Sequence, residues 1–303
     1  MGLIEDIHAG IKTRSLPTGG WAGGNGSQAS VETTCYALLA LHDRDSSARD
    51  NAIEFLSRVR NQDGSWPAFD GDDREGCWTT TLALITLRFI NVRFTNFEKS
   101  LAWLLKNKGR EGHWLWKWKF KTVDRAVQLN PDKFGWPWFP GSVSWIIPTA
   151  FSLIALRQSA ACCHTAEVTD RIRIGMDMLR DRACPQGGWN AGNGIVFGAA
   201  LRPHIDATAI ALLAVSDSSG DPTAIRGLGW LRDASKDCSS VFSLSWTALA
   251  MLMHRDATLN SCIAKLNEAF SGQSSISNIE ALSLAVIAMN AVQHDRNPFQ
   301  AVI

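Results

Sequence analysis

The sequence predicts an all-α fold in which six inner and six outer helices alternate around a ring, an (α/α)6 toroid. Three observations predict it: apolar runs that recur six times, segments with one charged face between them, and Gly-Trp turns ahead of several apolar runs. A chain of 303 residues that is 46% hydrophobic is long enough for one such ring. We therefore expect a single domain over residues 1–303.

The inner helices are predicted by runs that are apolar nearly all round, as in helices that are buried on every side. They share an Ala-Leu step or a close variant, and they span residues 33–41, 79–87, 148–156, 206–215, 243–253 and 280–289. The outer helices are predicted by segments with one charged face, at residues 48–60, 97–106, 169–182, 223–233 and 258–270. Residues 4–13 supply a sixth outer helix if they close the ring against the last inner one.

Glycine and tryptophan occur together in the turns ahead of the apolar runs. The four phrases are Gly19-Gly20-Trp21, Gln62-Asp63-Gly64-Ser65-Trp66, Gly112-His113-Trp114 and Gly187-Gly188-Trp189. Glycine permits a tight reversal, and we expect the indole to stack back on the preceding outer helix. The chain has 13 Trp and a single Tyr, which indicates repeated packing wedges, a large aromatic cavity, or both.

The phrase Gln62-x-Gly64-x-Trp66 and its neighbours resemble the QW repeats of the squalene-hopene and oxidosqualene cyclase family, and more loosely those of protein prenyltransferase β subunits. The resemblance covers almost the whole chain. It implies the toroid, and it implies acid-initiated cyclisation of a hydrophobic isoprenoid-type substrate in an aromatic-lined cavity. Zinc binding of the prenyltransferase kind is not expected, because Asp206 is followed by Ala207 and Thr208 where those subunits carry a Cys ligand.

The start of each inner helix is expected to contribute one residue to one mouth of the ring. Alignment of the inner helices on a shared small residue places six residues at equivalent positions: Glu32, Trp78, Ile147, Asp206, Ser243 and Glu280. Three of the six are carboxylic acids. Helix capping also favours acids in a first helical turn, so this ordinary structural role stays open beside a functional one.

The phrase His204-Ile205-Asp206-Ala207-Thr208-Ala209 resembles the Asp-x-Asp-Asp-Thr-Ala motif of class II terpenoid cyclases, whose middle Asp protonates an alkene. The middle Asp and the Thr-Ala step are kept, whereas both flanking Asp residues are replaced. The resemblance implies that Asp206 is a general acid and that His204 orients it. The alternative is an ion pair with His204, which makes Asp206 a poor acid.

Aromatic side chains are expected to line the cavity below the mouth. Trp246 is expected to point inward, with Trp78 and Trp145 near the rim and Tyr36 and Phe151 on the adjoining face. Aromatic faces stabilise carbocations and exclude water, which suits a polyene substrate, whereas core packing is the alternative role. Together with the mouth acids Glu32 and Glu280, these residues form the predicted substrate-binding set.

No cofactor and no metal site are expected, and Mg²⁺ enters only if the substrate carries a diphosphate. The cysteines and histidines lack zinc-finger spacing. The run Asp70-Gly71-Asp72-Asp73 matches the class II motif letter for letter, but it precedes the inner helix by several residues and lacks the Thr-Ala step. We interpret it as a solvated acidic turn.

The longest departure from the repeat is a Trp- and Lys-rich insertion at about residues 110–144. Trp114, Trp116, Trp118 and Phe120 alternate with Leu115, Lys117, Lys119 and Lys121, which predicts a strand with aromatics on one face. A lid over the cavity, a membrane-interface patch and a diphosphate-binding edge all stay open.

Charge and cysteine content restrict the partners and the location. A net charge of +1 argues against a nucleic-acid surface, and the seven scattered cysteines indicate reduced thiols in the cytoplasm. Prolines interrupt the longest apolar region, residues 136–156, so it does not predict a membrane span. A peripheral membrane contact and a homodimer stay open, since full cyclases use two helical domains and this chain supplies one.

Two other functions fit the same residues. One is a non-catalytic isoprenoid-binding, lipid-binding or scaffold protein that kept the toroid and lost the full acid motif. The other is a carbohydrate-active (α/α)6 enzyme, in which two of the three acids Glu32, Asp206 and Glu280 supply the carboxylate pair. An open groove lined by Tyr and Arg would be the signature of the second.

Overall fold

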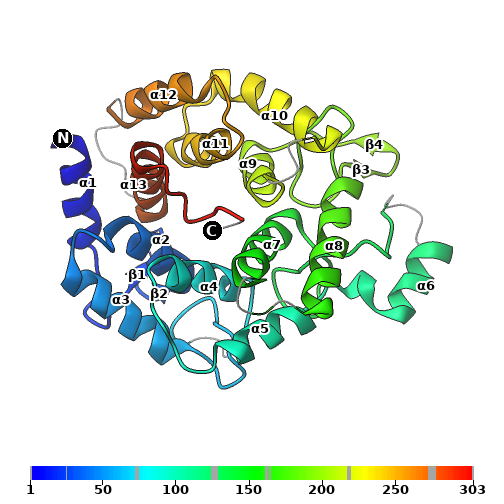
Figure 1. The fold of residues 1–303 in the computed structure, drawn as a ribbon, viewed down its shortest axis with the longest axis horizontal. Coiled ribbons are helices and arrows are strands. Elements are labelled where there is room, and N and C mark those ends of the chain that lie inside the picture. The colour runs from blue at the N-terminus through cyan, green and yellow to red at the C-terminus, as the bar shows by residue number, and fades with distance from the viewer. Residues whose placement is uncertain are drawn as a thin grey trace.

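The inner helices form a closed ring in the computed structural model (Figure 1). The structure describes residues 2–301 except 25, 72–74, 124–128, 161–162, 164, 217–219 and 272–277. The inner helices are α2 (Val31–Leu41), α4 (Thr79–Phe89), α7 (Ile146–Ala160), α9 (Ile205–Ala214), α11 (Val241–Met253) and α13 (Ile279–His294). Each contacts the next along the chain, and α13 contacts α2. The predicted (α/α)6 toroid is confirmed.

The outer ring consists of helices with one buried face, as their charge pattern predicts. They are α1 (Gly2–Lys12), α3 (Ser46–Val59), α5 (Phe97–Lys106), α8 (Ala166–Asp181), α10 (Pro222–Ala234) and α12 (Leu259–Ser271). Helix α1 packs against α13 and α2 and closes this ring. Side-chain caps begin several of these helices: Asp45 accepts from the backbone N–H of Ala48, and Thr165 from that of Val168.

Four buried tryptophans tie the outer helices to the inner ones. Their indole N–H groups donate to backbone carbonyls of the preceding outer segment, in the pairs Trp21–Ile11 (2.7 Å), Trp66–Leu56 (2.8 Å), Trp136–Leu104 (2.8 Å) and Trp189–Leu179 (2.7 Å). Their backbone N–H groups donate to threonine hydroxyls of the following inner helix, in the pairs Trp21–Thr34 (3.0 Å), Trp66–Thr80, Trp136–Thr149 and Trp189–Thr208 (all 2.9 Å). Both indole and backbone donors are therefore satisfied inside the core.

The third of these turns is Gly135-Trp136, and the expected turn at Gly112-His113-Trp114 is wrong. Trp114 is 72% exposed, whereas Trp136 is 1% exposed and makes the repeated bonds. A Cβ at Gly135 would lie 2.0 Å from the Thr149 hydroxyl, as one at Gly188 would lie 2.8 Å from that of Thr208. Glycine before the tryptophan therefore leaves room for the threonine.

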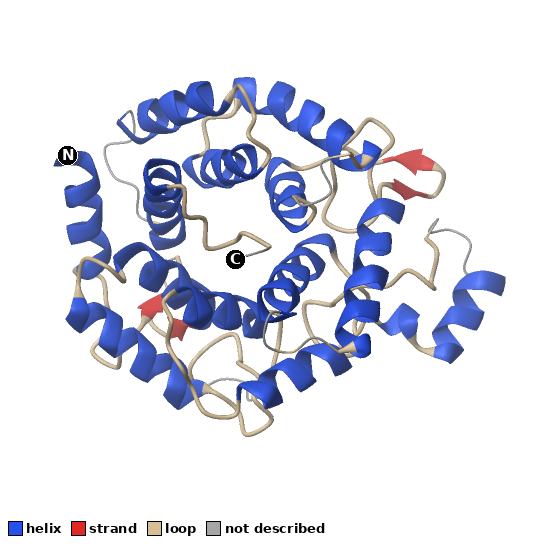
Figure 2. Cartoon of the chain, in the orientation of Figure 1, coloured by secondary structure: helices blue, strands red, loops and turns tan. Residues whose placement is uncertain are grey.

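Short strands and 3₁₀ turns complete the chain, and Figure 2 shows that the strands are confined to two small hairpins. Strand β1 (Trp21–Ala22) pairs antiparallel with β2 (Ala29–Ser30), and β3 (Ile195–Val196) pairs antiparallel with β4 (Ala199–Ala200). The 3₁₀ turns are η1 (Arg110–Gly112) and η2 (Ser235–Asp237). The strand expected in the insertion is wrong: residues Trp114–Thr122 form helix α6. In this run each aromatic residue also has another aromatic four positions away, as Trp114 has Trp118. A spacing of four fits one face of a helix as well as a spacing of two fits one face of a strand.

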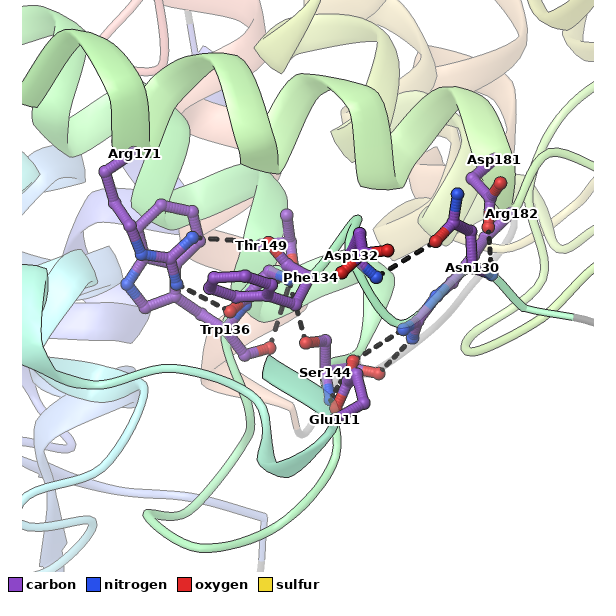
Figure 3. A network of polar contacts seen from close by, with 11 residues as sticks. Glu111, Asn130, Asp132, Phe134, Trp136, Ser144, Thr149, Arg171, Asp181 and Arg182 are labelled. Atoms are coloured by element: carbon purple, nitrogen blue, oxygen red, sulfur yellow. Dashed lines mark hydrogen bonds and ion pairs between the residues drawn. The ribbon is translucent and has the colours of Figure 1, made fainter. Parts of the chain in front are cut away.

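A buried polar network holds the base of the insertion to α8 (Figure 3). Glu111 is 0% exposed, and its carboxylate lies 2.5 Å from the guanidinium of Arg182, which is 1% exposed. Arg182 also donates to the backbone carbonyl of Ser144, at 2.7 Å. Arg171 lies 3.5 Å over the Trp136 ring and donates to the carbonyl of Gly135, at 2.7 Å. Paired charges and aromatic stacking thus fix the segments that begin and end the insertion.

The C-terminal segment turns into the inner ring after α13, as the red end of the chain in Figure 1 shows. Arg296 donates to the carbonyl of Phe89 at the end of α4, so the segment enters where the inner helices finish. Gln158 holds it by donating to the carbonyls of Pro298 and Gln300, at 2.9 and 2.8 Å. Phe299 is 0% exposed. No helix in the described part of the chain is long and apolar enough to cross a membrane.

Candidate functional site

The end of the ring where the inner helices begin, here called the mouth, carries the six residues that the helix alignment predicts. Each is half-buried, although the helix that follows it is buried nearly throughout: Glu32, Trp78, Ile147, Asp206, Ser243 and Glu280. One turn further in, Tyr36 is 1% exposed and Trp246 is 0% exposed. The mouth residues therefore meet solvent while the ring beneath them is closed.

Glu32 and Glu280 form a carboxylate pair at the mouth, from the first turns of α2 and α13. The Thr33 hydroxyl donates to Oε1 of Glu280, at 2.6 Å. Burial and, as a smaller cause, the negative charge of Glu280 together raise the pKa of Glu32 from 4.5 to about 7. Near neutral pH, Glu32 thus keeps a proton while Glu280 accepts a hydrogen bond.

The backbone at Gly23 lies close to Glu280 and to its Thr33 partner. A Cβ at Gly23 would lie 3.0 Å from Oε1 of Glu280 and 3.2 Å from the Thr33 hydroxyl. The side chain that glycine lacks would press on the carboxylate. The turn after β1 therefore limits the space around the Glu280 carboxylate and its Thr33 partner.

Asp206 lies in the first turn of α9 and keeps one carboxylate oxygen, Oδ1, buried without a hydrogen-bond partner among the described residues. His204 is exposed, and its Nε2 lies 3.3 Å from the side-chain nitrogen of Asn190. Within the described chain no hydrogen bond or ion pair joins His204 to Asp206. His204 is the extended N-cap residue of α9, so its side chain leaves the helix in another direction.

Thr208 explains part of the likeness to the cyclase acid motif. Its hydroxyl accepts the backbone N–H of Trp189, as the equivalent hydroxyls of Thr34, Thr80 and Thr149 do in the other Trp turns. The threonine after Asp206 therefore belongs to the structural repeat. It carries no separate information about an acid site.

Four aromatic side chains close the inner ring of helices beneath the mouth. We call these residues the floor: Tyr36, Phe151, Trp246 and Phe299. Phe299 lies 4.8 Å from Trp246 and 5.8 Å from Phe151, measured between ring centroids. Tyr36 lies 6.1 Å from Trp246 in an edge-on arrangement. The indole N–H of Trp246 is buried and has no partner among the described residues. The predicted aromatic residues thus come together, but the C-terminal segment fills the space beneath them.

Trp78 connects the mouth to the floor. Its ring lies 5.6 Å from that of Phe151 and 5.1 Å edge-on from that of Trp138. Trp145 is half-buried and lies apart from this stack, beside Gly192, where an added Cβ would meet its ring at 3.4 Å. The structure therefore brings Trp78, and not Trp145, into the aromatic group.

Sequence reasoning missed three contributors to the site. Phe299 follows the last helix in a segment without periodicity, and no pattern places it inside the ring. Trp138 belongs to a run of aromatics and prolines whose individual roles look alike in the sequence. Thr33 was signalled only by its position next to Glu32, since a hydroxyl in a first helical turn is a common partner for a nearby acid.

The acidic run at Asp70 does not form a described metal centre. Asp70 pairs with Arg58 at 3.0 Å, whereas Asp72 and Asp73 lie outside the described residues. Among the residues that the structure describes, no group of three or more His, Cys, Asp and Glu side chains is arranged to hold a metal ion.

Comparison with known proteins shows the fold. No protein-family model and no curated protein sequence matches this chain. Its structure is similar to an α-amylase from Clostridium perfringens, with a TM-score of 0.67 at 11% identity over 94% of this chain and 96% of that one. It is also similar to a GH76 α-mannanase from Bacteroides thetaiotaomicron, with a TM-score of 0.65 at 11% identity over 97% and 96%.

A terpene cyclase is among the similar structures. The type II terpene cyclase MstE from Scytonema, in complex with its product, matches with a TM-score of 0.61 at 15% identity over 96% of both chains. At these identities the comparisons establish the (α/α)6 architecture that all three proteins share, and fold alone does not fix the chemistry. The QW-repeat family stays a resemblance on the residues quoted above.

Proposed function

We propose that this protein is a terpenoid-cyclase-like enzyme that starts the cyclisation of a hydrophobic isoprenoid-type substrate by proton transfer at the mouth. One observation carries the proposal: Glu32 keeps a proton up to about pH 7 and sits above an aromatic floor. The likeness to MstE over 96% of both chains supports it, because a terpene cyclase structure can be matched by a single ring of this size.

Glu32 is the proton donor in this proposal. A carboxylic acid that remains neutral in a desolvated site can donate its proton to an epoxide oxygen or an alkene. Glu280 accepts the hydrogen bond of the Thr33 hydroxyl and returns a proton from solvent to Glu32, since both acids are half-buried. The cation formed on the substrate ends by losing a proton, so substrate and product are isomers.

The aromatic residues stabilise the positive charge that follows proton transfer. The faces of Trp78 and the floor carry negative quadrupoles, which attract a carbocation and offer it no nucleophile. Because Phe299 already fills the centre of the floor, a substrate binds above it, between the floor and the mouth residues. The substrate is accordingly held by its apolar body, with its reactive end at the carboxylate pair.

Asp206 is the second candidate for the donor, on the strength of the acid-motif resemblance and of its unpartnered buried oxygen Oδ1. The two candidates lie on different inner helices, so single amide substitutions separate them. His204 has no part in orienting Asp206 in this arrangement, because it contacts Asn190 instead.

The experiment incubates the purified protein with linear isoprenoids of increasing chain length that end in an alkene or an epoxide, and analyses the extracts by gas chromatography and mass spectrometry. We expect a product with the mass of the substrate and fewer double bonds or no epoxide. Glu32→Gln should form this product about 10²- to 10⁴-fold more slowly, whereas Asp206→Asn should form it as the wild type does. The matched control is Glu98→Gln, in the first turn of outer helix α5. The opposite result for the first two variants would move the donor to Asp206.

Glycoside hydrolysis is a second candidate, and the Glu32–Glu280 pair specifically favours it. Two carboxyl groups side by side, one of them with its pKa raised to about 7, are the residue types that a general acid and base require. Two of the similar structures are an α-amylase and an α-mannanase. The apolar floor and the burial of Tyr36, the single Tyr of the chain, disfavour a sugar site. Release of reducing sugar from a panel of glycans, without any isoprenoid product, would replace the first proposal by this one.

A further inference from the structure

We propose that α6 docks this protein on the surface of an anionic lipid bilayer. Helix α6 has no buried residue, and it carries the largest exposed apolar side chains in one place: Trp114 is 72% exposed, Trp118 60% and Leu115 50%. Figure 1 shows α6 projecting outside the outer ring. A soluble surface rarely exposes two tryptophans and a leucine side by side without a partner for them.

The three exposed side chains lie on one face of α6. Residues three and four positions apart project to the same side of a helix, which places Trp118 beside both Leu115 and Trp114. Lys121 lies along one edge of this strip and Lys119 along the other, where the Nζ of Lys119 lies 4.7 Å over the Trp116 ring. An apolar strip with aromatic rings and a lysine on each edge is typical of a helix that lies in the plane of a membrane interface.

The opposite face of α6 is occupied by contacts within the protein. Trp116 and Phe120 lie on that face with their ring centroids 6.3 Å apart, and the guanidinium of Arg110 lies 4.6 Å over the Trp116 ring. Lys117 lies 5.2 Å over the ring of Phe134. The apolar residues of α6 thus divide into a set that packs and a set that does not.

The base of α6 is rigid, so the exposed strip is held outward. The Glu111–Arg182 ion pair fixes the turn before the helix (Figure 3). Asp132 bridges Lys117 at 3.2 Å and Lys121 at 2.6 Å. The bond of Lys121 joins two half-exposed side chains and is therefore weak, which leaves this lysine able to exchange partners. A fixed helix presents its strip without an ordering cost on binding.

The positive charge of the segment around α6 favours an anionic bilayer as the partner of its exposed face. Residues 106–121 contain six Lys and Arg side chains and one acid, Glu111, whose charge Arg182 already compensates. The whole chain has a net charge of only +1, so this segment concentrates positive charge beside the apolar strip. Anionic headgroups attract such lysines, and indoles favour the level of the headgroups.

Docking through α6 brings the mouth close to the bilayer. The N–H of Arg110, in the turn before α6, donates to the carbonyl of Ser142 at 2.9 Å. The loop that contains Ser142 also contributes Trp138, which stacks against Trp78 at the mouth, and exposes Phe139 to 47%. A substrate dissolved in the bilayer would therefore reach the mouth without crossing much water.

The experiment measures cosedimentation of the full chain with vesicles of phosphatidylcholine, alone or mixed with phosphatidylserine. We expect binding to the mixed vesicles, a blue shift of tryptophan emission, and loss of binding on addition of salt. Trp114→Ser/Leu115→Ser/Trp118→Ser should weaken binding by about tenfold for each indole removed. Lys119→Gln/Lys121→Gln should weaken binding to the mixed vesicles by about fivefold for each lysine.

Matched controls replace exposed apolar residues elsewhere. Phe197 is 80% exposed at the β3–β4 hairpin and Ile225 is 58% exposed on α10, so Phe197→Ser and Ile225→Ser should bind as the wild type does. The substituted residues are exposed, so each variant should fold, and circular dichroism of each variant checks this. Absence of vesicle binding, or equal binding by the α6 serine variant, would overturn the proposal. So would a dimer in solution that only the α6 variant dissociates, since a second copy would then cover the strip.

Discussion

Glu32→Gln is expected to lower the turnover number by about 10²- to 10⁴-fold, the range for loss of a general acid. Glutamine keeps the shape of the protonated carboxyl but has no proton of that acidity to donate. The wild-type rate should also fall as the pH rises through about 7, because Glu32 must be protonated to act and its pKa is raised to about 7. Initial rates of product formation across this pH range check both effects.

Two outcomes separate a chemical role of Glu32 from a structural one. The Glu32→Gln protein should unfold at the same denaturant concentration as the wild type or a higher one, since the substitution removes a group that burial disfavours when it is charged. Glu98→Gln should retain wild-type turnover. A folded Glu32→Gln protein that turns over within a few-fold of the wild type would remove Glu32 from the mechanism.

Arg182→Leu is expected to destabilise the protein by about 3–5 kcal/mol, because it leaves the Glu111 carboxylate charged and without its guanidinium partner in the interior. Glu111 would keep only the backbone N–H of Ser144, at 3.2 Å. Denaturation by urea at neutral pH, followed by circular dichroism, measures the difference in the free energy of unfolding.

The control for this substitution is Arg173→Leu on α8, the helix that ends just before Arg182. Arg173 is 62% exposed and pairs with Asp170 and Asp177, so its loss should cost less than about 1 kcal/mol. In Arg182→Leu/Glu111→Leu the uncompensated charge is gone, and much of the lost stability should return. A single Arg182 variant as stable as the control would show that the pair does not hold the insertion in place.

The toroid could be predicted because the inner helices are apolar on all sides and the outer helices on a single face. This contrast is visible in a single sequence. The register of the inner helices was also predictable. The threonines that accept hydrogen bonds from the Trp turns, such as Thr80 and Thr208, have a constant separation in sequence from the small residue on which the helices are aligned. The position of the third Gly-Trp turn could not be predicted, because Gly112-His113-Trp114 and Gly135-Trp136 both contain glycine and tryptophan. Only burial distinguishes them.

Part of the candidate site could also be predicted. Closure of the ring brings Glu280 beside Glu32, although 247 residues separate Thr33 from Glu280 in sequence. The raised pKa of Glu32 could not be predicted, because it depends on the burial of this side chain in the folded ring and on the charge of Glu280. The place of Phe299 in the floor could not be predicted either, since it is set by contacts of a segment without periodicity.

The most direct test of a proton-donating mouth is the titration of Glu32 itself. Carboxyl-carbon NMR of protein labelled in glutamate should show one carboxyl that titrates at about pH 7 and is absent from Glu32→Gln. Glu280→Gln should lower that pKa but leave it above 4.5, because burial is the larger of its two causes. A Glu32 carboxyl that titrates near 4.5 in the wild-type protein would contradict the assignment of Glu32 as the acid.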